Sequence, residues 1–127
     1  MSRKSRENLE RKISIGVGTL QEALDRFESA WKSAERGTRI APEHRLTFSS
    51  LPRLLRELSP ARWVLIETLR AEGRMTVYAL AKRLNRNYKN VHTDVARLAE
   101  FGLVERTKDR KVHVPWDVIA AELRLAA

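Results

Sequence analysis

The sequence predicts an α+β fold in which a strand–helix–strand–helix segment precedes three helices and a hairpin. Two observations lead to this prediction. In the first half of the chain, period-two alternation and helical periodicity of the apolar residues follow one another. In the second half, three amphipathic stretches with capping signals precede two short β-type runs around a charged turn. The 127 residues are enough for one domain or for a small domain with an appendage.

The first segment, residues 1–58, contains one strand signal on each side of a long helix. Residues 12–17 alternate between apolar and small side chains, which predicts a strand with one buried face. Thr19 and Glu22 have the spacing of a capping box. The helix that they open carries one apolar stripe: Leu20, Leu24, Phe27, Trp31 and Ala34. Residues 45–49 predict a second strand and residues 51–58 a short helix. Two strands make a thin sheet, which needs a further strand from elsewhere.

The second segment, residues 59–127, begins at Ser59-Pro60, a capping residue followed by a proline that fits the first helical position. Three helices are expected over 59–73, 76–84 and 87–101, and the polar turn between the last two is very short. Two strands, 103–107 and 111–114, then enclose a charged tip. Three helices followed by a hairpin are typical of a winged helix-turn-helix domain. The tail from Trp116 onward fits a helix or a strand equally well.

The charge is strongly positive and unevenly distributed. The net charge is +9 and the sequence pI is about 10.6. Residues 74–111 hold ten Lys or Arg against four Asp or Glu, so under a third of the chain carries two thirds of the surplus. Such a surplus indicates a polyanionic partner, which could be nucleic acid or an anionic membrane. No apolar run reaches the length of a membrane span, so we expect a cytoplasmic protein.

The predicted third helix has the composition of a DNA-recognition helix. Val91, Val95 and Leu98 fall on one side, while the opposite side has no carboxylate between Arg83 and Thr93. Arg, Lys and Asn side chains hydrogen-bond to base edges, and a Thr methyl contacts thymine. A solvated helix surface is the plainer alternative. The expected DNA-binding residues on the helix and the hairpin are Arg86, Asn87, Tyr88, Lys89, Asn90, His92, Thr93, Arg97, Lys108, Arg110 and Lys111.

The second half resembles a known family over about residues 59–125. The matching motifs are ARW at 61–63, ALAKRL at 79–84, YKNVHTD at 88–94, FGLVE at 101–105 and VHVP at 112–115. They are similar to predicted winged helix-turn-helix regulators of prokaryotes, broadly related to the MarR and ArsR regulators. Some members of that family are encoded beside a toxin and are regarded as TumA-type antitoxins of a TumE-type toxin. The resemblance therefore implies a second role in binding a small toxin encoded next door.

Together these patterns predict a sequence-specific regulator of transcription that binds double-stranded DNA, most simply a repressor of its own operon. An RNA-binding or architectural protein is the alternative. We expect a homodimer whose interface is formed by the first segment, residues 1–58, because helix-turn-helix proteins that bind two DNA half-sites commonly have two-fold symmetry. The front half could equally serve as the partner-binding module. No enzyme activity, cofactor or metal is expected, since His44, His92 and His113 lack ligand spacing and cysteine is absent.

Overall fold

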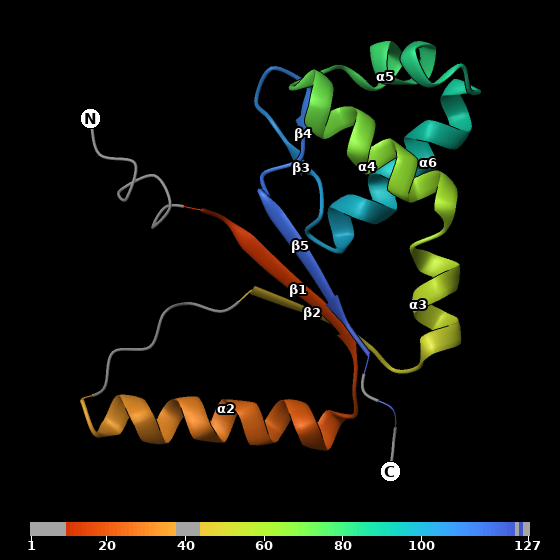
Figure 1. Ribbon diagram of the computed structural model, residues 1–127. Coiled ribbons are helices and arrows are strands. Elements are labelled where there is room, and N and C mark those ends of the chain that lie inside the picture. The colour runs from red at the N-terminus through yellow and green to blue at the C-terminus, as the bar shows by residue number, and fades with distance from the viewer. Residues whose placement is uncertain (1–9, 38–43, 124, 126–127) are drawn as a thin grey trace. The chain divides into compact units, whose positions relative to one another are not determined.

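A computed structural model describes residues 10–37, 44–123 and 125 of the chain (Figure 1). They divide into two compact units. One unit consists of Leu58–Asp117 with residues 10–11, and the other consists of the described parts of Lys12–Glu57 and Val118–Ala127. The described residues form five helices and two small sheets, so the expected mixture of helices and strands is confirmed. No helix among them is long and apolar enough to cross a membrane.

The sheet unit contains a three-stranded parallel sheet with strand order β2-β1-β5. The expected strand–helix–strand–helix order is confirmed close to its predicted bounds, and α3 packs against β1 and β2. Ile13, Ile15 and Phe48 on the strands and Leu54 on α3 are buried. The elements are β1 (Lys12–Val17), α2 (Leu20–Glu35), β2 (His44–Phe48), α3 (Leu51–Glu57) and β5 (Val118–Glu122).

The third strand of this sheet comes from the tail of the chain. In β5, Ile119 lies opposite Ile13 and Ala121 lies opposite Ile15. The sequence pattern of the tail fits a helix or a strand, and the predicted boundaries assign the tail to the second segment. In the structure the tail forms a strand in the sheet of the first segment. The reason is that β1 has two sides to pair, and β2 occupies one of them.

The helix α2 begins at the predicted capping box. Thr19 Oγ1 accepts a hydrogen bond from the backbone N–H of Glu22 at 3.2 Å, and Glu22 Oε1 accepts one from the N–H of Thr19 at 3.2 Å. This pair satisfies two backbone donors that a helix start leaves open. The apolar stripe of α2 forms as predicted, but none of its residues is buried.

The helical unit contains three helices and a two-stranded antiparallel sheet. Each helix begins close to its predicted start, with Ser59 and Thr76 as the expected capping residues and Asn87 as a cap that the sequence pattern did not predict. The strands are shorter than expected, because Leu103 and Val104 are buried in the core instead of pairing along the sheet. The elements are α4 (Pro60–Glu72), α5 (Val77–Leu84), α6 (Tyr88–Glu100), β3 (Glu105–Arg106) and β4 (Val112–His113).

The core of the helical unit lies where its three helices and its hairpin meet. Gly102 has a φ of 79°, a conformation that favours glycine, and lies just after the end of α6. Trp116 is buried, and its indole N–H donates a 2.8 Å hydrogen bond to the carbonyl of Gly102. The apolar core side chains are Leu65, Ile66, Leu69, Leu80, Ala81, Val91, Val95, Leu98, Leu103, Val104, Val112 and Val114.

Candidate nucleic-acid interface

A tight turn positions α6 relative to α5. Asn85 ends α5 in the left-handed conformation, with φ 54° and ψ 47°, which asparagine tolerates better than most residues. Asn87 then caps α6: its side-chain oxygen accepts hydrogen bonds from the backbone N–H groups of Lys89 at 2.8 Å and Asn90 at 3.3 Å. Three residues therefore separate the two helices, and the direction in which α6 leaves the turn is fixed by local hydrogen bonds.

Asp94, the carboxylate in the middle of α6, lies on the inner side of the helix. Its side chain is 13% exposed and accepts a hydrogen bond from Arg62 Nε at 3.0 Å and another from Arg86 Nη2 at 2.8 Å. Arg62 belongs to α4 and Arg86 to the turn before α6. The three side chains therefore connect the first helix, the turn and the last helix by charge-assisted hydrogen bonds.

The outer side of the first half of α6 is polar and lacks negative charge. Lys89 and Asn90 are exposed and, among the described residues, their side chains make no hydrogen bond or ion pair. Thr93 is also exposed, but its hydroxyl donates a 3.0 Å hydrogen bond to the carbonyl of Lys89, so its methyl group is the part left for contact. Lysine, an amide and a methyl group are the chemical groups that base edges in a major groove accept.

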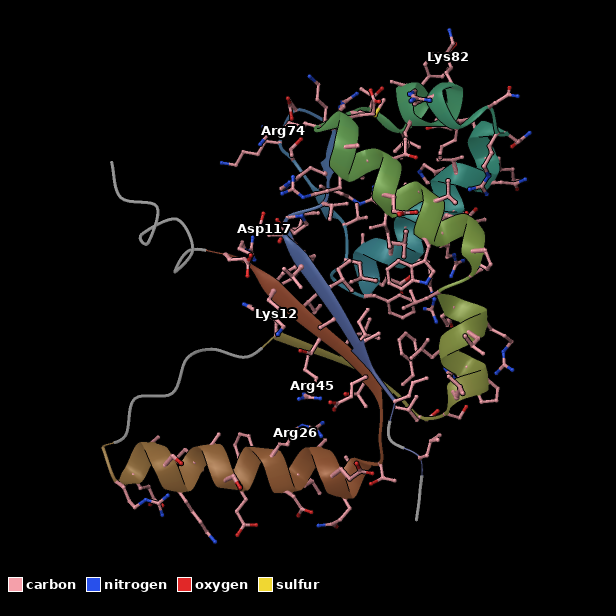
Figure 2. The ribbon with its side chains drawn as sticks, in the orientation of Figure 1. Lys12, Arg26, Arg45, Arg74, Lys82 and Asp117 are labelled. Carbon is pink, nitrogen blue, oxygen red and sulfur yellow. The ribbon has the colours of Figure 1, made fainter. Side chains whose placement is uncertain are left out.

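An exposed aromatic cluster lies where α5 and α6 begin. The ring centroids of Tyr78 and Tyr88 are 6.4 Å apart, and those of Tyr88 and His92 are 5.9 Å apart. Tyr78 is 62% exposed and Tyr88 49% exposed, and the ammonium of Lys82 lies 5.5 Å from the ring of Tyr78. Figure 2 shows Lys82 pointing outward from α5. The cluster offers flat apolar surfaces beside cationic groups.

The hairpin between β3 and β4 ends in a compact charged tip. The Thr107 N–H donates to the carbonyl of Lys111 at 2.8 Å, and Arg110 has a φ of 64° in the turn between them. The Thr107 hydroxyl donates a hydrogen bond to Asp109, which lowers the pKa of that carboxyl, and the charges of Lys111 and Arg74 lower it further. Asp109 therefore stays ionised and offsets part of the positive charge of the tip.

The structure brings the predicted site residues of α6 together and assigns some of them internal roles. Arg86 is an expected DNA contact that is instead bound to Asp94, with its Nη1 buried and without a hydrogen-bond partner among the described residues. Asn87 uses its side chain as the helix cap. Arg97 pairs with Glu100 at 3.4 Å and its guanidinium lies 4.7 Å from the Phe101 ring. The predicted residues left exposed to a ligand are Tyr88, Lys89, Asn90, His92, Thr93, Lys108 and Arg110, with Lys111 partly exposed.

Sequence reasoning missed two members of the exposed surface, Tyr78 and Lys82. Each residue of a helix advances by about 100°, which places both on the flank of α5 and off its buried stripe of Leu80 and Ala81. The helical spacing of Tyr78 and Lys82 could therefore have identified them as exposed residues. Tyr88, an expected DNA-binding residue, is half exposed and has the ring of Tyr78 as its neighbour.

In the part of the chain that the structure describes, no group of three or more His, Asp or Glu side chains is arranged to hold a metal ion. The described carboxylates of the helical unit mostly face arginines: Asp94 pairs with Arg62 and Arg86, and Glu72 pairs with Arg83 at 3.2 Å. The site that remains is a surface of donors and aromatic rings.

A family model matches the second half of the chain. The family model HVO_A0114 matches residues 57–121, which include all of the helical unit from Leu58 and most of β5. No curated protein and no solved structure matches the chain. The name of the family states no activity, so the site has to be interpreted from its own geometry. Because the match covers just over half of the 127 residues, the chain belongs to the HVO_A0114 family.

Proposed function

We propose that the protein is a winged helix-turn-helix regulator of transcription that binds double-stranded DNA at specific sequences. In this proposal α6 enters the major groove with Lys89 and Asn90 toward the base edges, and the β3–β4 hairpin is the wing that contacts the backbone. A recognition helix of this type reads bases with its N-terminal residues while the helix before it crosses the backbone. Here α5 has that position in the order of elements.

The observation that carries the proposal is the internal neutralisation of Asp94. It is the one carboxylate between Tyr88 and Ala99, and it is turned away from solvent against two arginines. The outer face of α6 is therefore left with cationic and amide groups up to Glu100. A solvated surface helix has no need to bury its carboxylate, because an exposed ion pair contributes as much or more at less desolvation cost.

A second candidate function is binding of single-stranded RNA, and the exposed aromatic cluster favours it. Unpaired bases stack on tyrosine and histidine rings, and Tyr78, Tyr88 and His92 present three rings close together. In a duplex the bases are already stacked and such rings have less to bind. Duplex DNA remains the first candidate because Lys89 and Asn90 fit paired base edges and the hairpin supplies backbone contacts.

Fluorescence anisotropy on labelled nucleic acids tests the proposal. The full chain is titrated with a DNA duplex from the region upstream of its own gene, with a scrambled duplex, and with single-stranded RNA of the same sequence. We expect the upstream duplex to bind at least about 1,000-fold more tightly than the scrambled one. This ratio is the lower end of the specificity that sequence-specific DNA-binding proteins show. RNA that competes as well as the upstream duplex would establish the second candidate instead.

The hairpin gives a separate prediction about the salt dependence of binding. Replacing Lys108 and Lys111 by Ala is expected to weaken binding to every duplex alike and to lower the slope of log K against log salt by about two, because each lost phosphate contact removes about one released counterion. The matched control replaces Arg53 and Arg56, which lie on α3 in the other unit. If the hairpin variant keeps the parent slope, the hairpin does not lie on the DNA.

Repression of its own operon and neutralisation of a toxin stay predictions from the sequence. The upstream duplex in the anisotropy experiment tests the first of them directly. The second requires a protein surface outside the proposed DNA face, and the sheet unit is where such a surface exists.

A further inference from the structure

The helix α2 exposes a row of large apolar side chains. Leu20 is 76% exposed, Leu24 51%, Phe27 68% and Trp31 59%, and α2 has no buried residue at all. The spacing of four, three and four residues places them in one line along the helix, as in the seam of a coiled coil. We call these four residues the α2 seam. Four large apolar side chains exposed side by side on a small protein mark an interaction site.

The opposite, polar side of α2 faces the sheet of its own unit. Glu22, Asp25 and Arg26 of α2 line a pocket together with Arg45 of β2 and Glu122 of β5. Figure 2 shows Arg26 and Arg45 in the space between the helix and the sheet. A crossover helix ordinarily turns its apolar stripe to the sheet. Here the polar side occupies that place, so the sheet of the same unit cannot cover the α2 seam.

We propose that the α2 seam is covered by the α2 seam of a second copy, with the two helices antiparallel about a two-fold axis between Leu24 and Phe27. In this arrangement Leu20 lies opposite Trp31 of the second copy, and Leu24 lies opposite Phe27 of the second copy. Each small side chain meets a large one, which is how facing layers fill the space between two helices. A parallel pair would instead place Trp31 against Trp31 and Leu20 against Leu20.

The side chains that flank the α2 seam fit this arrangement. In an antiparallel pair each flank meets its own counterpart. One flank carries Ala23, Ala30 and Ala34, whose small side chains let the helices approach closely. On the other flank, Glu28 is paired with Lys32 at 2.9 Å. This carboxylate is thus already engaged within its own helix, and the repulsion between the two copies of Glu28 across the axis is reduced.

The exposed area of the α2 seam reaches the lower limit of what specific interfaces bury. The exposed parts of two leucines, a phenylalanine and a tryptophan amount to on the order of 500 Å² in each copy. Two copies then bury on the order of 1,000 Å² together, which is where specific interfaces begin. The rings of Phe27 and Trp31 are already stacked, with centroids 6.5 Å apart and an interplanar angle of 24°, so part of the α2 seam is ordered before association.

This pairing does not depend on the proposed DNA binding, although a two-fold dimer would suit a reader of two half-sites. Sedimentation velocity of the full chain without DNA tests it. The parent protein is expected to be a dimer at micromolar concentration. The double variant Phe27→Ser, Trp31→Ser is expected to raise the dimer Kd by about 100-fold or more, as loss of two central aromatic anchors does. The matched control is Leu55→Ser, an apolar side chain on α3 that is 60% exposed, which should leave the dimer intact.

Disulfide cross-linking tests the direction of the helices, because the chain has no cysteine of its own. Leu20→Cys mixed with Trp31→Cys should give a cross-linked dimer on oxidation, while either variant alone should not. A monomeric parent protein at 100 μM would overturn the proposal. So would a double variant that still dimerises, or a toxin from the neighbouring gene that binds α2 of a monomeric chain. Cross-linking of Leu20→Cys alone would overturn the antiparallel arrangement.

Discussion

Replacing Asp94 by Ala is expected to lower the free energy of unfolding of the helical unit by about 2–4 kcal/mol. The substitution takes the carboxylate away from two guanidinium groups that are themselves mostly buried, with side-chain exposures of 16% for Arg62 and 29% for Arg86. Removal of one partner from a buried ion pair leaves uncompensated charge, and this costs far more than the intact pair contributes. Arg86 is the more sensitive of the two, because its Nη1 is already buried without a partner among the described residues.

Urea unfolding followed by circular dichroism measures this effect. Glu72→Ala is the matched control, because it also removes a carboxylate bound to an arginine, but that pair is exposed, with side-chain exposures of 59% for Arg83 and 39% for Glu72. An exposed pair contributes about 1 kcal/mol or less. Equal losses of stability in the two variants would mean that Asp94 is an ordinary surface carboxylate, and the observation that carries the proposed function would be lost.

Replacing Asn90 by Ala is expected to weaken binding to a specific duplex by about 1–3 kcal/mol, or roughly 5- to 150-fold, and to leave non-specific binding unchanged. The side chain of Asn90 is exposed, and only its backbone N–H takes part in the cap of α6. The variant should therefore fold like the parent protein. The loss should be confined to duplexes whose bases Asn90 contacts.

The measurement uses a duplex that the parent protein selects from a random pool, compared with a scrambled duplex by anisotropy. Gln21→Ala is the matched control, since it removes the same kind of amide from α2, in the other unit. Affinity for the selected duplex equal to that of the parent would show that the assignment of this face of α6 to the bases is incorrect.

The elements with strong local signals could be predicted from the sequence. Thr19, Ser59 and Thr76 each cap a helix where the capping pattern placed it. Capping depends on residues within one turn of the helix, so a single sequence contains the whole signal. The buried side of α6 could be predicted for the same reason, because Val91, Val95 and Leu98 repeat at helical spacing.

The features that depend on residues far apart in the chain could not be predicted. β5 pairs with β1 across about a hundred residues, and nothing local in the tail distinguishes a strand that pairs from one that does not. The contact of Arg62 with Asp94 joins residues that are 32 positions apart, and it depends on how α4 packs against α6. The orientation of α2 could not be predicted either. An apolar stripe predicts that one side of a helix is covered, but it does not indicate which part of the protein, or which partner, covers it.

The most direct test of the central claim, that α6 and the hairpin form the DNA surface, is an NMR titration of the ¹⁵N-labelled protein with duplex DNA. We expect the amide signals of Tyr88–Thr93 and of residues 108–111 to shift most, while those of α3 and the three-stranded sheet stay in place. A titration in which the α6 signals do not move while those of another surface do would contradict the claim.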